Sequence, residues 1–218
     1  MNCLLCQSTS AAAFKVLKKP ERHYFHCAEC DFIFMDPAER LSPQDEKARY
    51  DLHQNQDDLG HRAFLRPLLD QIQKIQKSST LSPSEFKALD YGCGAEPILG
   101  NMMLETGIIA TNYDLFFRPD QDAFSKTYHL ITSTEVWEHF YDPRTEIERL
   151  IKLLRHHGVL AVMTSGHKGE AAFHDWYYRR DPTHVAFFSE KTMAWLAQTF
   201  KLEVLSHRSP YWLFRKTT

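Results

Sequence analysis

The sequence has little of what would direct a protein to a membrane or to nucleic acid. It contains no apolar run near the ~20 residues that a membrane-spanning helix needs, and its first residues lack the basic flank and apolar stretch of a signal peptide. Acidic and basic side chains nearly balance, 28 against 26, which leaves a formal net charge of −2. Bulk charge therefore offers no attraction to nucleic acid or to an anionic membrane. The 218 residues show no internal repeat, and we predict a cytoplasmic protein with one α/β domain and a small appendage.

Cysteine is also scarce, but four of the five cysteines form two closely spaced pairs. In a reducing compartment such pairs are more often metal ligands than disulfides. Each pair puts two thiolates on one tight turn, and two turns supply a tetrahedral zinc site. A unit this small buries too little surface to be stable alone, so zinc would supply its folding energy. We predict a zinc ribbon over residues 1–36, with the ion held by Cys3, Cys6, Cys27 and Cys30.

Two histidines near the second pair, His23 and His26, are alternative ligands, although four cysteines already complete the shell. A filled shell leaves no position for water, so the predicted ion is structural. The ribbon then stabilises the fold, or it forms a wall of the substrate site or binds a partner. The sequence leaves these roles open.

The rest of the chain predicts an α/β fold. Residues 37–85 form a polar linker and a leading helix, in which apolar side chains recur at helical spacing from Leu65 to Ile75. From residue 86 to 218, strands and helices alternate, which predicts a mostly parallel sheet of seven strands or fewer with helices on both faces. The strands are expected at residues 86–91, 108–113, 129–133, 159–164, 202–205 and 212–214.

One helix has clear end signals. Asp142 caps its start and Pro143 suits its first turn, while Gly158 is typical of an end. We therefore predict that His156 and His157 lie at the carboxyl end of this helix and bond its last carbonyls.

A cofactor-binding turn is predicted at Gly92-Cys93-Gly94. A buried strand ends there, and two glycines let the backbone approach a ligand just before a helix begins. Asp114 ends the next strand, where an acid that binds ribose hydroxyls belongs. Cys93 is interpreted as a small loop residue without chemistry of its own.

The charges beside this turn favour S-adenosylmethionine (SAM) over a dinucleotide. A dinucleotide needs its pyrophosphate at the helix start, usually with a third glycine, where Pro97 stands here. Asp90 and Glu96 would both oppose a pyrophosphate. SAM carries a sulfonium and an ammonium and no phosphate, so nearby acids are tolerable or favourable.

Three motifs resemble those of class I SAM-dependent methyltransferases. Leu89 to Gly94 is similar to their first motif, Thr134 to Phe140 followed by Asp142-Pro143 to their fourth-strand motif, and Leu153 to Leu160 to a later leucine- and glycine-containing segment. A cysteine-paired ribbon also precedes this domain in some bacterial members. The resemblance implies a Rossmann-like sheet and methyl transfer from SAM.

The resemblance also implies roles for single residues. Gly92 and Gly94 would line the methionine part of SAM, and Asp90 and Cys93 lie in the same turn. Asp114 would bind the ribose, and Glu135 would lie near the methyl group. Asp122-Ala123 would contact the adenine. The sequence departs from the family at Glu96, which often is glycine, and over residues 116–126, which offer no clear third strand.

Two acid–imidazole clusters are the candidates for catalysis. Glu135, Glu138 and His139 follow the fourth strand, and His184 lies in the connection that normally covers the acceptor in this architecture. A hydroxyl or amine acceptor must lose a proton, and we predict His184 as the base. Glu-x-x-Glu-His with a distant histidine also resembles the metal-binding set of small-RNA 2′-O-methyltransferases, so a second divalent ion is an alternative.

Other residues of the same connection are weaker candidates. Arg179 and Arg180 either hold a phosphate or carboxylate of the substrate or are solvated. Trp176, Tyr177 and Tyr178 either line an aromatic acceptor pocket or pack as core and rim.

We predict a SAM-dependent methyltransferase that acts on a hydroxyl, amine or carbon of a small molecule. The alternatives are a non-catalytic SAM-fold protein whose ribbon recruits nucleic acid or protein, and a nicotinamide-dependent oxidoreductase. Neither the acceptor nor the oligomeric state follows from the sequence.

Overall fold

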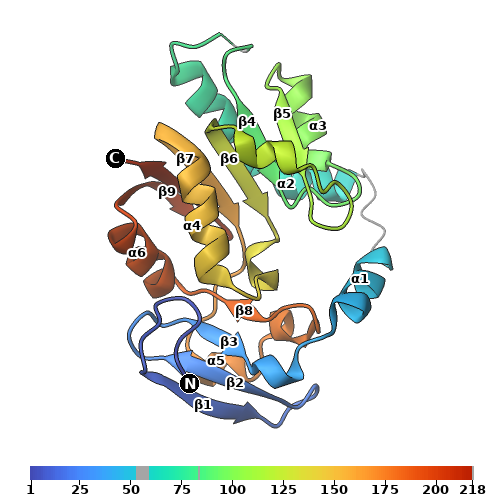
Figure 1. Ribbon diagram of the computed structural model, residues 1–218, viewed down its shortest axis with the longest axis vertical. Helices are drawn as coiled ribbons and strands as arrows, with labels where there is room; N and C mark the ends of the chain where they lie inside the picture. The colour runs from blue at the N-terminus through green and yellow to red at the C-terminus, as the bar shows by residue number, and fades with distance from the viewer. Residues whose placement is uncertain (53–58, 83, 218) are drawn as a thin grey trace.

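The computed structural model describes residues 1–52, 59–82 and 84–217. A small antiparallel sheet contains β1 (Ala11–Val16), β2 (Arg22–Cys27) and β3 (Ile33–Met35). Strand β8 (Ala186–Phe187) pairs with β3 and completes this sheet. A sheet that begins at the N-terminus is therefore finished by a strand from near the other end of the chain (Figure 1).

The large sheet has six strands in the order β5-β4-β6-β7-β10-β9. Strands β5, β4, β6 and β7 run parallel, and β10 pairs antiparallel with both β7 and β9. This arrangement confirms the predicted α/β fold with a mostly parallel sheet. The strands are β4 (Ala88–Tyr91), β5 (Ala110–Tyr113), β6 (Tyr128–Thr134), β7 (Leu154–Met163), β9 (Leu202–Arg208) and β10 (Tyr211–Lys216).

Helices cover both faces of the large sheet, as the pattern predicted. Successive side chains of a strand point to opposite faces, so Leu130 joins the core beneath α2 (Leu59–Ser78) and α3 (Ile98–Glu105). Ile131 joins the core beneath α4 (Pro143–Leu153) and α6 (Glu190–Thr199). In the described residues, no helix is long and apolar enough to cross a membrane.

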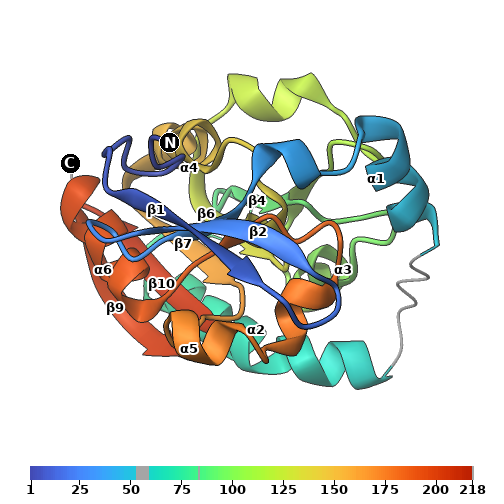
Figure 2. The ribbon, with the colours of Figure 1, turned by 90° about the horizontal axis from the view of Figure 1, so that it is seen from below.

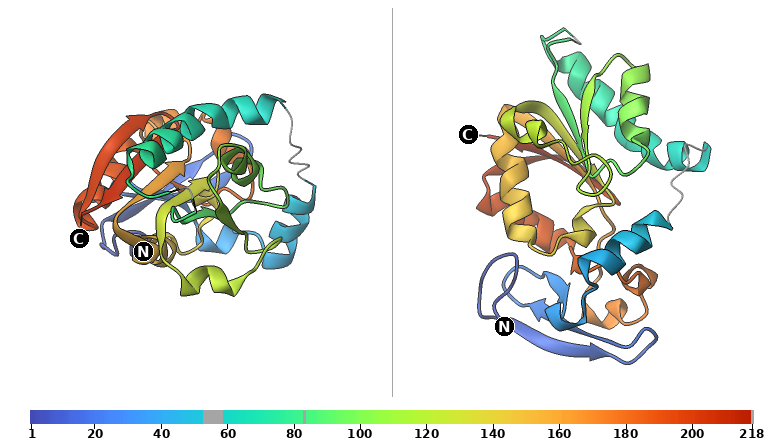
Figure 3. Two further views of the ribbon diagram at one scale, coloured as in Figure 1. Left: turned by 90° about the horizontal axis from the view of Figure 1, so that it is seen from above. Right: turned by 45° about the vertical axis from the view of Figure 1, so that its right-hand side comes forward.

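The remaining helices are short and lie mostly near the ribbon. Helix α1 (Pro43–Asp51) lies beside the ribbon (Figure 3), and Phe173 of α5 (Glu170–Phe173) packs against Phe14 and Tyr24 of its strands. The 3-10 helices are η1 (Pro37–Glu39), η2 (Gln121–Ser125), η3 (Trp137–His139) and η4 (Tyr177–Arg180). Helix η2 stands where the sequence offered no clear third strand.

The ribbon lies across the carboxyl edge of the parallel strands. In Figure 2, seen from below, β1 and β2 cross in front of that edge. Tyr24, Phe32 and Phe34 of the ribbon belong to the same buried cluster as Ile131 and Leu160 of the large sheet. The shared core and the β3–β8 pairing both cross the predicted boundary at residue 36.

The predicted end of the α4 helix is wrong. The helix stops at Leu153, and β7 begins at Leu154, so His156 and His157 lie in exposed strand rather than at a helix terminus. The buried Leu154 pairs with Tyr128 of β6, and the next pair joins Leu130 to Val159, so the chain bulges between them. The pairing of β7 with β6 therefore ends the helix before Gly158, the glycine at which its end was predicted.

Candidate active site and thiol cluster

The four paired cysteines converge in the ribbon. Sγ of Cys3 lies 3.6 Å from Sγ of Cys30, and Sγ of Cys6 lies 3.5 Å from Sγ of Cys27. All four sulfurs lie within 4.8 Å of one another. Zinc–sulfur bonds of about 2.3 Å in a tetrahedron place sulfurs roughly 3.8 Å apart, so the donor set fits zinc. The alternative histidine ligands are engaged elsewhere, His26 with Asp31 at 2.8 Å and His23 with Glu39.

The predicted cofactor turn has the backbone that its glycines allow. Gly92 and Gly94 have φ angles of 79° and 69°, in the left-handed region. A Cβ on Gly92 would come within 2.3 Å of Cγ2 of Val136, so the turn packs directly on the segment that follows β6. The amides of Gly92 and Cys93 donate to the carbonyl of Tyr113 at 2.8 and 3.1 Å, which joins the turn to the end of β5.

Asp114 is held beside this turn by backbone amides. Its carboxylate accepts hydrogen bonds from Gly94 at 3.0 Å, Phe116 at 2.9 Å and Phe117 at 3.0 Å. These bonds fix the carboxylate at the end of β5, which is where a ribose would be bound in a parallel sheet of this kind.

Of two other predicted members of the turn, Asp90 is buried and Cys93 is half-buried. Asp90 is 2% exposed and accepts a hydrogen bond from Thr132 at 2.7 Å, and burial raises its pKa to about 6. Burial also raises the pKa of the Cys93 thiol to about 12, so this thiol stays protonated at neutral pH. Of the predicted adenine pair, Ala123 is buried and Asp122 is exposed in η2.

Glu135 and Glu138 meet at the hydroxyl of Tyr178. Glu135 follows β6 with a φ of 54°, and its Oε2 lies 3.1 Å from the Tyr178 oxygen. Oε1 of Glu138 lies 2.5 Å from the same oxygen, while its Oε2 accepts a hydrogen bond from Thr164 at 2.8 Å. A phenol donates only one hydrogen, so at most one of these two contacts is a tyrosine-donated bond.

This geometry favours a proton shared within the carboxyl pair. Burial and the neighbouring Glu138 raise the pKa of Glu135 to about 8, and burial raises that of Glu138 to about 7. Two carboxylates that lie close together away from water repel each other, so the two carboxyl groups are not both ionised. Oε1 of Glu135 is buried and accepts no hydrogen bond from the described residues.

The two predicted histidines lie together. The rings of His139 and His184 are 4.8 Å apart. Nδ1 of His139 donates to the carbonyl of Thr183 at 3.0 Å, and Nδ1 of His184 donates to that of Tyr178 at 2.7 Å. Each ring therefore has Nε2 as its basic nitrogen. Ligand atoms of Glu138, His139 and His184 lie within 4.8 Å of one another, so these three residues could hold a divalent ion.

The two predicted arginines have different environments. Arg179 is 1% exposed and donates to the carbonyls of Lys18, Pro20 and His174 at 2.9–3.2 Å. It joins the acceptor-side loop to the ribbon, so neither alternative predicted for Arg179, a contact with a substrate anion or a solvated side chain, is correct. Arg180 is exposed and lines a cavity of about 450 Å³. Glu135, Tyr177, Tyr178 and His184 line the same cavity, together with Arg49 and Asp181.

Three contributions were missed by the sequence reasoning. Tyr178 was expected to line an aromatic pocket or to pack as core or rim, whereas its hydroxyl lies between the two carboxyls. Thr164 supports Glu138 from the end of β7. Arg49 reaches the cavity from α1, in a segment predicted to be linker. The sequence could have indicated Thr164 only through its position at the end of a predicted strand. No local sequence signal indicates that Arg49 belongs to the site.

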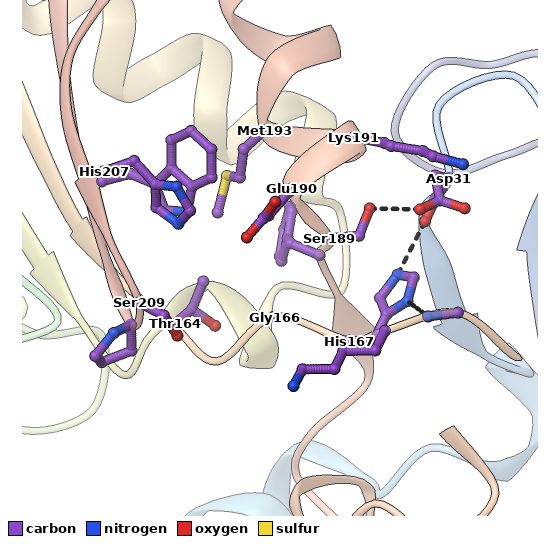
Figure 4. Close-up of a pocket in the computed structure, with 15 residues that line it drawn as sticks. Asp31, Thr164, Gly166, His167, Ser189, Glu190, Lys191, Met193, His207 and Ser209 are labelled. Carbon is purple, nitrogen blue, oxygen red and sulfur yellow. Dashed lines mark hydrogen bonds between the residues drawn. The ribbon is translucent and has the colours of Figure 1, made fainter. Parts of the chain in front are cut away.

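A larger cavity of about 650 Å³ lies between the ribbon, the start of α6 and the turn joining β9 to β10. On its wall, Asp31 accepts a hydrogen bond from Ser189 at 2.6 Å through its carboxylate and from His167 at 2.9 Å through its carbonyl (Figure 4). Burial lowers the pKa of His167 to about 4, so this ring is neutral. The described residues that line this cavity include none of the predicted cofactor or catalytic residues.

Comparison with known proteins agrees with this geometry. Residues 58–207 match a family model described as a methyltransferase domain. A comparison with curated proteins found no match. Among solved structures, an O-methyltransferase family protein from Burkholderia thailandensis is similar with a TM-score of 0.51 and 11% identity, over 78% of this chain and 61% of that one. Magnesium protoporphyrin IX methyltransferase from Synechocystis PCC 6803, with bound S-adenosylhomocysteine (SAH), has a TM-score of 0.51 and 12% identity, over 79% and 92% of the two chains.

The chain belongs to the methyltransferase family, and its sheet has the class I SAM-dependent methyltransferase fold. The prediction of this fold and enzyme class is confirmed. The chain spans 61% of the Burkholderia protein's length.

Proposed function

We propose that this protein transfers the methyl group of SAM to a hydroxyl, amine or carbon of a small molecule. The observation that carries this proposal is Glu135. It lines the smaller cavity, has a buried oxygen without a partner among the described residues, and directly precedes Val136, which packs on Gly92. One residue thus links the cofactor turn to the cavity. The similar Synechocystis enzyme is named for a small-molecule acceptor, a magnesium porphyrin, which agrees with this proposal.

The cofactor half of the site would bind SAM as follows. Gly92 and Gly94 would lie against the methionine part, and Asp114 would accept the two ribose hydroxyls. Asp90, which is buried against Thr132, would support the turn from beneath. Glu135 would lie near the sulfonium and the ammonium of SAM. Both groups are positively charged, and a carboxyl group is compatible with them.

The acceptor half would align the nucleophile and receive its proton. Nε2 of His184 is the basic nitrogen of a ring fixed by the carbonyl of Tyr178, and we assign it as the general base. Glu138 and Tyr178 would hold the rim of the cavity around Glu135.

A divalent ion is a second candidate for the same residues. The convergence of Glu138, His139 and His184 within 4.8 Å favours it. Both rings direct Nδ1 to a backbone carbonyl, which is the usual support for a metal-ligating histidine. A bound ion would acidify an acceptor hydroxyl.

The ribbon would bind one structural zinc ion through Cys3, Cys6, Cys27 and Cys30. The sulfur distances and the absence of any histidine from the cluster support a closed shell. Of the alternatives, the family match argues against a nicotinamide-dependent oxidoreductase. A ribbon that recruits a partner is compatible both with an active enzyme and with a non-catalytic protein.

Calorimetry with SAM and SAH tests the proposal. Binding at roughly micromolar affinity, about −8 kcal/mol, is expected. Absence of both heat and thermal stabilisation with either ligand would leave a non-catalytic protein with this fold. A screen of hydroxyl, amine and carbon acceptors with labelled SAM then identifies the reaction.

A further inference from the structure

The smaller cavity has two arginines on its wall that neither the cofactor nor methyl transfer requires. Arg49 reaches it from α1 and Arg180 from η4. The carboxyl groups on the same wall belong to Glu135 and Asp181. The balance of these four groups determines which ligands the cavity accepts.

Arg49 is only partly satisfied. Its Nη2 lies 3.5 Å from Oδ2 of Asp181, and the other carboxylate oxygen of Asp181 accepts hydrogen bonds from Thr183 at 2.7 and 3.0 Å. Nε of Arg49 is buried and has no hydrogen-bond partner in the described ranges. A buried donor without a partner is costly, so a ligand oxygen at this position would be favoured.

Arg180 is held in place by its neighbours. Arg22 of the ribbon donates to the carbonyl of Arg179 at 3.2 Å and to that of Asp181 at 3.3 Å, which are the residues on either side of Arg180. The backbone is thus fixed, while the side chain is exposed and forms no ion pair with a described residue. The guanidinium is presented at the cavity without a counter-charge of its own.

The acids of the cavity do not neutralise both arginines. Oε2 of Glu135 lies 3.1 Å from the hydroxyl oxygen of Tyr178, so this carboxyl faces Tyr178 and forms no ion pair with either arginine among the described residues. Backbone and side-chain hydrogen bonds from Thr183 help to lower the pKa of Asp181 despite its partial burial, so Asp181 is ionised. The carboxylate of Asp181 lies against Arg49, and no described carboxylate forms an ion pair with Arg180, so at least one guanidinium is available to an anionic ligand.

We propose that the methyl acceptor carries a carboxylate or phosphate group, bound by Arg49 and Arg180, with its reacting atom turned toward Glu135 and His184. This inference rests on the proposed methyltransferase function and names its substrate class. Guanidinium groups bind oxyanions through paired N–H donors, and a cavity of about 450 Å³ accommodates a small organic acid or phosphate ester. Tyr177, at 67% exposure, and Tyr178 supply aromatic surface at its wall.

The test measures anion binding to the SAH-saturated protein by calorimetry, with inorganic phosphate, benzoate and the neutral benzamide as probes. At least one anion is expected to bind more tightly than benzamide. Arg180→Gln and Arg49→Gln should each weaken that anion about 10- to 100-fold, as expected for a lost charged hydrogen bond. Arg155→Gln, which changes an exposed arginine on β7 outside the cavity, is the matched control and should leave the affinity unchanged.

The outcomes separate this inference from the function on which it rests. Tighter binding of phosphate assigns a phosphate ester, and tighter binding of benzoate assigns a carboxylic acid. No preference for either anion over benzamide, or equal affinities in the native protein and both glutamine variants, overturns the inference while SAH binding persists. Failure to bind SAH refutes the methyltransferase proposal instead, and the same anion titrations are then made on the protein without SAH. If Arg49→Gln fails to fold, the exposed Arg180→Gln alone decides.

Discussion

The two halves of the proposed site are built differently. The proposed cofactor half lies at the ends of two adjacent strands, where the amide of Gly92 donates to the carbonyl of Tyr113 and the amide of Gly94 donates to the carboxylate of Asp114. The acceptor half is assembled from α1, η3, η4 and the ribbon, which are far apart in sequence. The first half depends on local backbone geometry and the second on long-range contacts, so mutations should affect them separately.

The largest effect is expected from Cys27→Ser. It should abolish zinc binding. The ribbon supplies two carbonyls that Arg179 bonds, those of Lys18 and Pro20, and it pairs with β8, so acceptor chemistry should be lost as well. SAH affinity should change little, since the cofactor half lies on β4 and β5. Elemental analysis and calorimetry measure the two effects. Freshly purified native protein without zinc, or a variant that retains it, would contradict the assignment.

His184→Ala should slow methyl transfer by roughly 10²–10⁴-fold, the range for a lost general base, with SAH affinity nearly unchanged. Single-turnover rates with the true acceptor give the comparison. Partial recovery with excess magnesium or manganese would instead identify His184 as a metal ligand. Unchanged turnover in both His184→Ala and Glu138→Ala would leave these residues structural.

Arg179→Met should reduce the free energy of unfolding by about 3 kcal/mol, because three backbone carbonyls lose the hydrogen bonds that the buried guanidinium donates. Urea denaturation monitored by fluorescence measures this. The adjacent Arg180→Gln, which alters an exposed side chain, is the control and should be nearly neutral. Equal stabilities of the two variants would mean that the tie between ribbon and loop contributes nothing.

Asp114→Ala tests the cofactor half. It should weaken SAM and SAH binding by roughly 1.5–3 kcal/mol, the value of hydrogen bonds to a charged acceptor, and leave phosphate or benzoate binding unaltered. Isothermal calorimetry with each ligand separates the two. An unchanged SAH affinity would place the ribose elsewhere.

The smallest effect is the pH dependence of stability. In the folded protein the pKa values of Glu135 and Glu138 are raised to about 8 and about 7 from an ordinary value of 4.5, so the folded state binds more protons between these limits. Stability should therefore fall as pH rises from about 5 to 8, by about 1–2 kcal/mol after allowing for coupling. Denaturation at several pH values measures the slope, and Glu138→Gln should flatten it. A stability that rises with pH over this window would contradict the shared-proton arrangement.

The sequence predicted the backbone of the Gly92–Gly94 turn more fully than the surroundings of the residues that line the smaller cavity. Glycines in a strand–turn–helix pattern mark Gly92 and Gly94, because the left-handed φ that they adopt is a local requirement. Arg179 and Arg180 look alike in sequence, yet one is 1% exposed and the other lies on the surface. The position of the ribbon determines which of the two arginines is buried. The predicted end of α4 failed for a similar reason, because pairing of Leu154 with Tyr128 is a tertiary contact.

The pairing of β3 with β8 has a consequence for how the chain comes together during synthesis. Residues 33–35 leave the ribosome long before residues 186–187, so the edge of the first sheet must wait for most of the chain. Contacts of such long sequence separation form slowly, and an uncovered strand edge is prone to wrong pairing in the interval. The small sheet, whose first three strands are made before any strand of the large sheet, is thus completed only after β7 has been made.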